Sequence, residues 1–215
     1  MVACGDADGA VTGNTRRFGA SLDKIKQVVD VRDGEIMFGL NMVVHKGKTI
    51  FVGDTSVHEY PTSEQMAEIA ISTARVVRLF GFEPKVAFVS HSTFGQPLTS
   101  RTKHIRKAVD ILKEKKVDFE FDGDMQPDVA LNPEYEELYP FSKIVGNANI
   151  LIMPGQHSAA ISYKMMKTLG DTKVIGPLLI GLGLPVEIAP LRSSTSEIIN
   201  LASIAAYSAD VIKYS

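Results

Sequence analysis

The second half of the chain alternates short apolar runs with longer segments of helical periodicity. The runs Val86–Val89, Ile150–Met153 and Val186–Ala189 are too short, and too closely flanked by turn-forming residues, to be helices. Strands that alternate with helices over connections of ordinary length are typical of a largely parallel sheet with helices on both faces. The sequence therefore predicts an α/β fold.

The first half of the chain adds a hairpin and the best-defined helix. Ile36–Val44 and Thr49–Val52 are predicted strands joined by a turn with Gly47 at positive φ, which makes the expected sheet mixed. Thr62 and Gln65 form a capping box at the start of a helix with a clear apolar stripe. The other expected elements are helices at Ser21–Val29, Arg101–Lys115, Ala159–Leu169 and Ser194–Ile212, short strands at Phe119–Phe121 and Leu178–Ile180, and a break at Gly176-Pro177. Small residues along the last helix predict a closely packed neighbour.

Composition narrows the class of protein. The chain has 215 residues, 45% of them hydrophobic, with a net charge of −2 and a pI near 6.2. This charge offers no footprint for nucleic acid or an anionic membrane, and no apolar run approaches the roughly 18 residues that span a bilayer. Cys4 is the only cysteine, which excludes an internal disulfide and a cysteine metal site and fits a reducing cytoplasm. We expect a soluble, cytoplasmic protein of one domain over residues 1–215, with no linker.

Three familiar kinds of catalytic or cofactor site are not supported. Ser90-His91-Ser92 lacks the Gly-x-Ser-x-Gly elbow of α/β-hydrolases, and neighbouring side chains on a strand point to opposite faces. The five histidines form no i, i+4 pair, and no Gly-x-Gly-x-x-Gly run lies between a strand and a helix. We therefore expect no catalytic triad, no metal and no dinucleotide cofactor in this domain.

Two acidic or glycine-rich stretches leave alternatives open. Asp122, Asp124 and Asp128 could hold a hard cation, but we favour Asp124 and Asp128 as the start or cap of a short helix near Pro127. The stretch Gly5–Gly13 could form a cation loop, could bring backbone amides to an anion, or could be a flexible terminus.

Hydroxyl side chains and glycines recur where the predicted strands end. Since ligands of open α/β sheets bind at the carboxyl ends of strands, these loops are expected to gather at one cleft. Hydroxyls, backbone amides and helix N-termini suit phosphate oxygens without a dense basic patch. The sequence therefore predicts a cleft for a phosphorylated or acyl ligand. The loops are Asp54-Thr55-Ser56, Ser90–Gly95, Asp122-Gly123, Pro154–Ser158, Gly176-Pro177 and Ser193–Ser196.

Taken in order, several motifs resemble the phosphate acetyl/butyryl transferase family, closest to the form fused to the C-terminus of bacterial NADP-dependent malic enzymes. They are Gly5–Gly13, Val86–Gly95, Asp122–Asp128, Pro140-Phe141-Ser142, Ile161–Lys164, Ile175–Leu178 and Ser194–Asn200. The resemblance covers essentially the whole chain. It implies a three-layer αβα fold like that of isocitrate and isopropylmalate dehydrogenases, a cleft for coenzyme A and acetyl phosphate, and a homodimer. It also implies that the chain lacks the N-terminal part of the family domain and the malic enzyme module, to which NADP and a divalent metal would belong.

The resemblance also implies a set of ligand-binding residues. They are Ser90, Ser92, Thr93, Gly95, Asp122, Tyr163, Lys164, Gly176 and Pro177.

The chain departs from the active transferases at the positions that carry the chemistry. The Ser-Arg-Gly segment of the family aligns with Pro190-Leu191-Arg192, which leaves Arg192, displaced by one position, as the sole catalytic candidate. Ala159-Ala160 replaces a Gly-Asn pair, and Phe94 replaces a polar residue. Removing one donor to a developing oxyanion costs roughly 10²–10³ in rate, so little turnover is expected. The resemblance thus implies a domain that binds acetyl-CoA or a related CoA ester and regulates a malic enzyme. The alternatives are a working phosphate acetyltransferase and a structural dimerisation module.

Overall fold

The computed structural model describes residues 1–214, and side chains through residue 211. Its contacts divide the chain into two compact units. Unit 2 comprises Met42–Val174, and unit 1 combines Met1–Asn41 with the residues from Ile175 onward. The boundary between the two units cannot be recognised from the amino-acid composition, because it lies within two strands and not in a linker. These strands are β2 (Phe38–His45) and β7 (Thr172–Ile180), which cross from one unit to the other within regular structure.

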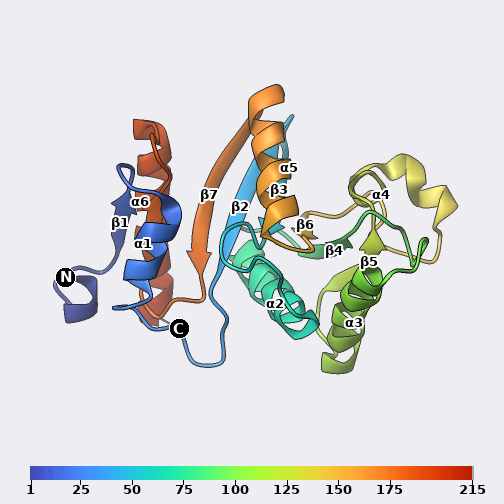
Figure 1. Ribbon diagram of the computed structural model, residues 1–215, viewed down its shortest axis with the longest axis horizontal. Helices are drawn as coiled ribbons and strands as arrows, with labels where there is room; N and C mark the ends of the chain where they lie inside the picture. The colour runs from blue at the N-terminus through green and yellow to red at the C-terminus, as the bar shows by residue number, and fades with distance from the viewer. Residues whose placement is uncertain (215) are drawn as a thin grey trace. The chain divides into compact units, whose positions relative to one another are not determined.

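Six strands form the larger sheet, in the order β5-β4-β6-β3-β2-β7 (Figure 1). β6 pairs in parallel with both β3 and β4, and β4 pairs in parallel with β5. β2 and β3 are joined by a two-residue turn, Lys46-Gly47, which makes this pair antiparallel. The sheet is therefore mixed and mostly parallel, as predicted. The remaining strand bounds are β3 (Lys48–Gly53), β4 (Lys85–Val89), β5 (Glu120–Met125) and β6 (Ile150–Ile152).

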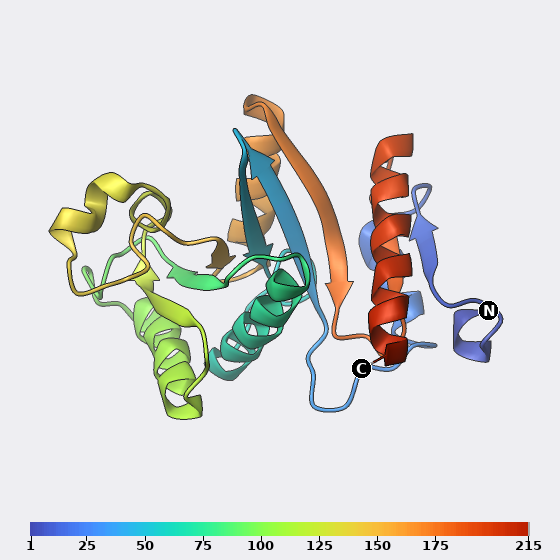
Figure 2. The same cartoon turned by 180° about the vertical axis from the view of Figure 1, so that it is seen from behind.

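Helices cover both faces of the unit 2 strands. α2 (Ser63–Leu79) packs on β3, β4 and β6, while α3 (Ser100–Lys115) packs on α2 and β5 (Figure 1). The opposite face carries α4 (Pro127–Leu131) and α5 (Gln156–Leu169), as the view from behind also shows (Figure 2). This three-layer αβα arrangement confirms the predicted α/β fold. A short 3-10 helix, Pro133–Leu138, follows α4.

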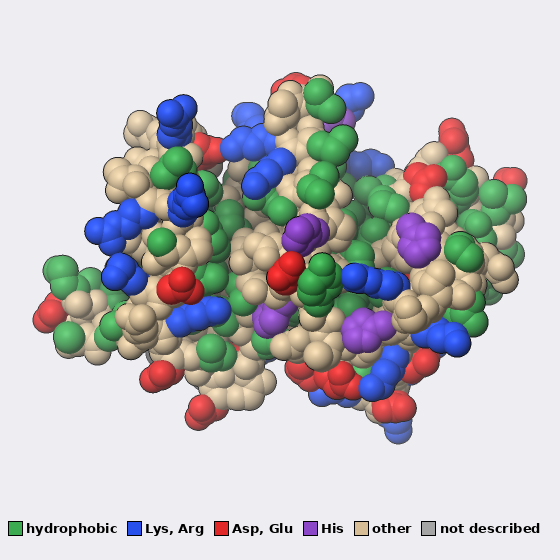
Figure 3. Space-filling model, viewed as in Figure 1, with side chains coloured by type: hydrophobic (Ala, Val, Ile, Leu, Met, Phe, Trp, Pro, Cys, Tyr) green, Lys and Arg blue, Asp and Glu red, His purple; other side chains and the backbone are tan. Residues whose placement is uncertain are grey.

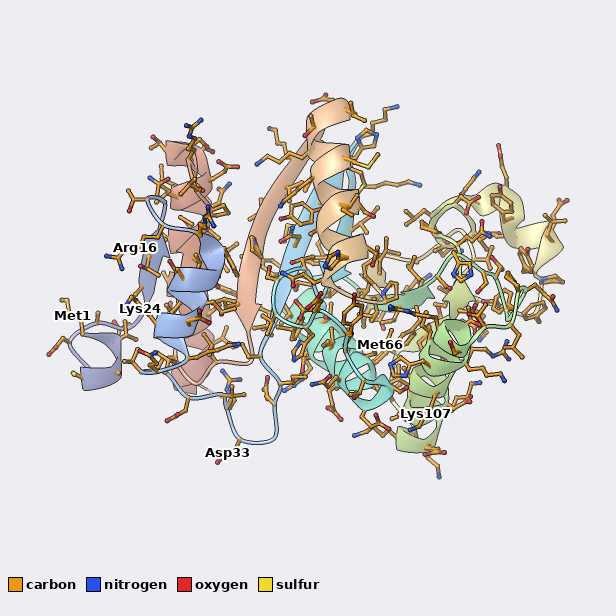
Figure 4. The ribbon with its side chains drawn as sticks, in the orientation of Figure 1. Met1, Arg16, Lys24, Asp33, Met66 and Lys107 are labelled. Atoms are coloured by element: carbon orange, nitrogen blue, oxygen red, sulfur yellow. The ribbon has the colours of Figure 1, made fainter. Side chains whose placement is uncertain are left out.

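The side chains of each central strand pack alternately against the helices on one face of the sheet and those on the other. Successive side chains of a strand point to opposite faces, so adjacent residues enter different layers. Phe51, Phe88 and Ile150 are fully buried toward α2 and α3, as is Met66 of α2, labelled in Figure 4. Val52, Val89 and Leu151 belong to the cluster on the other face, which includes Ala159 of α5. The central residues of β3, β4 and β6 are thus apolar in succession because both faces of these strands are buried.

Local signals predicted several boundaries correctly. Thr62 and Gln65 form the capping box, with the Gln65 N–H 3.1 Å from Thr62 Oγ1 and the Thr62 N–H 2.8 Å from Gln65 Oε1. Lys46 and Gly47 both adopt positive φ, 46° and 79°, as the hairpin required. A second capping box at Ser194 and Glu197 precedes α6 (Thr195–Tyr214).

Other boundaries differ from the prediction. Strand β5 continues to Met125 instead of ending at Phe121, because parallel pairing with β4 overrides the weak strand propensity of Asp122 and Gly123. β7 runs unbroken through Gly176-Pro177, since Pro is tolerated in a strand at the edge of a sheet. α5 begins at Gln156, three residues before the prediction. The first helix was predicted too far along the chain, and its observed bounds are Phe18–Ile25.

Unit 1 is built around a second, two-stranded sheet. β1 (Ala10–Gly13) pairs in parallel with β8 (Val186–Ala189), with Ala10 opposite Val186. α1 packs on these strands, and so does α6, whose Leu201, Ala205 and Ala209 are buried. The close neighbour predicted for the small residues of the last helix is therefore this sheet. A 3-10 turn, Val2–Cys4, precedes β1.

One buried carboxyl group stands out in unit 1. Glu187 of β8 is 3% exposed, and its Oε2 accepts a hydrogen bond from the N–H of Leu179 at 2.9 Å. Burial raises the pKa of Glu187 to about 8, against the smaller opposing effect of that N–H.

Among the helices that residues 1–214 form, we find none with the length and apolar character needed to cross a bilayer.

Candidate functional site

The loop Ser90–Gly95, here called the serine loop, follows β4 at the carboxyl edge of the sheet. β3, β4 and β6 are parallel, so the segments after all three strands meet at this edge. The backbone N–H of Ser90 donates to the carbonyl of Met125 at 2.9 Å, and that of Phe94 donates to the carbonyl of Asp124 at 2.6 Å. The loop is therefore tied to the end of β5 from its first residue to its fifth.

Asp124 is the side chain that fixes the serine loop. It is fully buried, its Oδ1 accepts from the N–H of Gly95 at 3.0 Å, and its Oδ2 accepts a short hydrogen bond from the Ser92 hydroxyl. Arg106 Nη1 lies 4.0 Å from Oδ1, which places a positive charge beside the buried carboxylate. The favoured interpretation of Asp124 as a helix cap is wrong, because α4 has Gln126 at its N-cap with no side-chain cap bond.

The hydroxyls of Ser90 and Ser92 form a hydrogen-bonded chain that ends at Asp124. Ser92 is fully buried, and its Oγ lies 3.1 Å from Ser90 Oγ. Ser90 is therefore the member of this hydrogen-bonded chain that faces an open space, while Asp124 orients it through Ser92. A nucleophile needs access to its substrate as well as a base, and Ser92 has no access.

A hollow of about 470 Å³, here called the serine hollow, lies in front of Ser90. Ser90 and His91 form one wall, and Ser158 and Ser162, one turn apart on α5, contribute further hydroxyls. The rest is mostly apolar, with Arg101 at its edge. A mostly apolar cavity with a few convergent polar groups is the usual form of a small-molecule site. The remaining lining residues are Val89, Ile105, Pro127, Met153 and Pro154.

Thr93 and Phe94 face a different hollow, of about 440 Å³. There Phe94 forms a tilted pair with Tyr139 at 5.3 Å between ring centroids, and an edge-to-face pair with Phe141 at 4.8 Å. Thr93 Oγ1 accepts from the N–H of Gln126 at 3.3 Å. The serine loop thus divides its predicted ligand residues between two hollows.

Replacing Phe94 by leucine is expected to lower the free energy of unfolding by about 1 kcal/mol, because it removes both aromatic pairs but keeps an apolar side chain. Phe94 has a φ of 49°, and leucine keeps whatever strain this imposes. Urea unfolding followed by circular dichroism measures the difference. Phe82→Leu is a matched control, since Phe82 makes one aromatic pair, with Phe51. A loss at Phe94 no larger than at Phe82 would contradict the idea that this ring cluster secures the loop.

The other predicted residues of unit 2 lie outside the serine hollow. Asp122 is in β5, where its Oδ1 accepts from the neighbouring N–H of Gly123 at 2.9 Å. Tyr163 packs against the apolar cluster of the sheet, and the ammonium group of Lys164 lies 5.9 Å from the centroid of its ring. On α5, Ser158 and Ser162 line the hollow instead.

Gly176, Pro177 and Arg192 belong to unit 1. Gly176 has a φ of 119°, and a Cβ at this position would lie 2.8 Å from Leu40 O, so the close backbone approach requires glycine. Arg192 is exposed, and its N–H donates to the carbonyl of Asn14 at 3.2 Å. Its φ of 63° is a conformation that favours glycine, which is the residue the resemblance places there.

Asp54 at the end of β3 has a role that the sequence did not assign. It is 1% exposed, and its Oδ1 accepts from the N–H of Ser56 at 2.8 Å. Its Oδ2 lies 2.7 Å from both the backbone N and the Nδ1 of His58, which fixes that imidazole. Asp54 and Asp124 thus each use a buried carboxylate to hold a loop at this edge of the sheet. Asp54 holds the residues that directly follow it, up to His58, whereas Asp124, near the end of β5, holds Gly95, 29 residues earlier in the chain. Only the first of these has a local signal, an aspartate at the end of the apolar run of β3, followed by Thr55 and Ser56.

The acidic cluster does not form a cation site. Asp122 and Asp124 have the partners given above, and Asp128 accepts from the Tyr135 hydroxyl at 3.2 Å. Within the described part of the chain, no three His, Cys, Asp or Glu side chains are grouped as metal ligands.

Comparisons with known proteins agree over nearly the whole chain. The family model of the phosphate acetyl/butaryl transferases matches residues 1–206. An NADP-dependent malic enzyme of Rhizobium meliloti is 47% identical over 97% of this chain, which spans only 28% of that enzyme. A phosphate acetyltransferase of Bacillus subtilis is 32% identical over 96% of this chain and 64% of its own length. A phosphotransacetylase from Streptococcus pyogenes has the same fold, with a TM-score of 0.91 and 31% identity over 97% of this chain and 65% of that structure.

Proposed function

The chain belongs to the phosphate acetyl/butaryl transferase family, and from that premise we propose that it binds acetyl-CoA or a related CoA ester as a regulatory domain. We propose further that it is the phosphotransacetylase-like part of an NADP-dependent malic enzyme, since such an enzyme is 47% identical to it. The ligand then acts on the malic enzyme by favouring one of two states of the whole protein, which requires a higher affinity for that state.

The serine loop is the observation that carries this proposal. Asp124 holds the loop through Ser92 and Gly95, so the Ser90 hydroxyl is presented to the serine hollow without rearrangement. Preorganised hydroxyls favour binding because little side-chain freedom is lost when the ligand arrives. The apolar walls suit an acyl chain and a thioester, while Ser162 adds a hydroxyl that can donate to a carbonyl oxygen. The Ser158 hydroxyl already donates to the carbonyl oxygen of Gly155 at 2.8 Å, so toward a ligand it can only accept.

The residues of the loop after β8 support binding without rapid acyl transfer. Pro190 and Leu191 offer no side-chain donor, and the Arg192 backbone occupies the position of a glycine in active relatives. Loss of one preorganised donor costs roughly 10²–10³ in rate, and this loop lacks both the hydroxyl and the arginine of the family segment. Binding, by contrast, depends on loops that the chain retains.

Two measurements on the chain test the function. We expect titration calorimetry to show acetyl-CoA binding, and CoA-dependent phosphate release from acetyl phosphate to be at least about 100-fold slower than with the Bacillus subtilis phosphate acetyltransferase. Release at a comparable rate would show a working transferase with Arg192 in the catalytic role. If acetyl-CoA gave no heat and did not displace a fluorescent CoA analogue, the domain would be a structural module.

A homo-oligomer is the second part of the proposal, and α5 is the surface that supports it. Ile161, Met165 and Leu169 recur every four residues on this helix and are 59%, 54% and 80% exposed. Apolar residues in such a row are typical of a face that a partner covers, and a two-fold dimer would pair the row with itself. Sedimentation velocity of the chain and of its Met165→Glu variant measures this, with dissociation expected for the variant.

A further inference from the structure

A second hollow adjoins the serine hollow and shares three of its walls. This space, here called the tyrosine hollow, measures about 410 Å³. Arg101, Ile105 and Pro154 line both hollows, so the two spaces meet along these residues. A ligand that fills the serine hollow and is longer than that space can continue past Arg101. The other residues of the tyrosine hollow are Tyr60, Pro61, Thr62, Ser100 and His104.

Arg101 is the only lysine or arginine among the residues that line either hollow. It is exposed, and its guanidinium carbon lies 5.0 Å from the centroid of the Tyr60 ring. Within the described residues it has no acidic partner, whereas Arg78, Arg106 and Lys107 nearby each face a carboxylate. An arginine with no acidic partner, at the junction of two hollows, suits a phosphate group because its planar fork can bond two oxygens.

The exposed ring of Tyr60 offers a surface for a flat ligand group. Tyr60 is 62% exposed, and its ring is parallel to that of His157 within 11°, with 6.4 Å between the centroids. This spacing lies near the upper end of the roughly 4.5–7 Å range of aromatic pairs, so the rings are loosely associated. Figure 3 shows histidine side chains at several separate places on the face it presents. Glu59 is the nearby acidic residue, and it faces His157 Nε2 at 3.3 Å.

The backbone around the hollows adds to the attraction for anions. α2 and α3 both begin at the tyrosine hollow, where Thr62 and Ser100 line it, and α5 begins directly after Pro154. The N-terminal end of a helix carries a partial positive charge, and three such ends face these adjoining spaces. His104 keeps the starts of α2 and α3 together, since its Nδ1 lies 3.0 Å from Ser63 Oγ and its Nε2 lies 2.9 Å from the carbonyl oxygen of Pro61.

We propose that the two hollows form one groove for an extended acyl-CoA, in which Arg101 binds a phosphate and the Tyr60 ring contacts the purine ring. This assignment rests on the proposed function, because it takes the acyl end of the ligand to occupy the serine hollow. It adds the residues that would distinguish a CoA ester from a short acyl phosphate. Acetyl phosphate fills only the serine hollow, whereas the nucleotide end of CoA requires the tyrosine hollow.

Arg101→Gln and Tyr60→Ala test the groove, with acetyl-CoA, adenosine 3′,5′-bisphosphate and acetyl phosphate as separate probes in calorimetry. We expect each variant to bind acetyl-CoA roughly tenfold more weakly, and to lose a similar factor for the bisphosphate, which carries the purine and phosphates alone. Affinity for acetyl phosphate should be unchanged. Lys103→Gln is the matched control, because it removes one charge from the same exposed helix turn without lining either hollow.

The outcomes separate the two proposals. Acetyl-CoA binding of equal strength in the wild type, Arg101→Gln and Tyr60→Ala would overturn the groove and leave the proposed function standing. A wild type that binds no acetyl-CoA would overturn both. If Arg101→Gln weakened acetyl phosphate and spared the bisphosphate, Arg101 would belong to an acyl phosphate site and the purine assignment would be wrong. Unchanged melting temperatures show that the variants are folded. Arg101→Lys keeps the positive charge but not the planar guanidinium group, so its affinity for acetyl-CoA should lie between that of the wild type and that of Arg101→Gln.

Discussion

Replacing Asp124 by alanine is expected to lower the free energy of unfolding by about 3 kcal/mol and to abolish detectable acetyl-CoA binding. Hydrogen bonds to a charged group contribute about 1.5–3 kcal/mol each, and buried donors that lose their acceptor carry a desolvation cost as well. Asp124 accepts from the Ser92 hydroxyl and the Gly95 N–H, so its loss leaves two donors unsatisfied inside the protein. Arg106 would also lose the carboxylate 4.0 Å away.

Asp122→Ala is the control for this experiment. Asp122 lies two residues earlier on the same strand but is only half-buried, and within the described part of the chain its side chain accepts from the neighbouring Gly123 N–H and from no other group. Its replacement should cost less than about 1 kcal/mol. Denaturant unfolding and calorimetry with acetyl-CoA provide the two readouts. Equal effects at both positions would mean that Asp124 is not the anchor of the serine loop.

Replacing Glu187 by glutamine is expected to stabilise the protein in alkaline solution, by about 2–4 kcal/mol at pH 9. Burial raises the pKa of Glu187 to about 8 in the folded protein, against an ordinary value of 4.5. As the pH rises, the unfolded chain therefore releases this proton before the folded chain does. The wild type has its full stability below pH 4.5 and loses this contribution as the pH rises to about 8. Glutamine keeps an oxygen for the Leu179 N–H but has no proton to lose.

The difference between the variant and the wild type should therefore shrink toward zero as the pH falls to 4. Urea unfolding at several pH values measures it. Glu114→Gln, at an exposed position of α3, should show no such trend. A Glu187→Gln curve parallel to that of the wild type from pH 4 to pH 9 would mean that Glu187 ionises as readily in the folded protein as in the unfolded chain.

The parts of the fold that local chemistry decides could be predicted from the sequence. Capping boxes at Thr62 and Ser194 depend on residues three positions apart, and the hairpin depends on Gly47, so each signal is contained in a few residues. The extent of β5 could not be predicted, because Asp122 and Gly123 are poor strand formers and become a strand only through pairing with β4. The division into two units was equally hidden, since it cuts through β2 and β7.

The sequence predicted the position of the serine loop but not the residue that holds the loop in place. The serine loop was identified because hydroxyls follow an apolar strand. The partner that fixes it, Asp124, is 32 residues from Ser92, and no local pattern connects the two. Arg101 has no distinguishing signal in the sequence, because an exposed arginine in the first turn of a helix is ordinary. Its significance comes from Tyr60, 41 positions away, and from the hollow between them.

The pairing of β1 with β8 has a consequence for how the protein is made. Ala10 faces Val186, so the two strands of this sheet leave the ribosome far apart in time. Unit 2 is contiguous from Met42 to Val174 and can fold while synthesis continues. The first strand must wait, unpaired, until β8 has emerged. Closing so long a connection is entropically costly unless an already folded unit 2 brings its two ends together. Folding of the central segment of the chain thus brings β1 and β8, which belong to the two outer segments, close enough to pair.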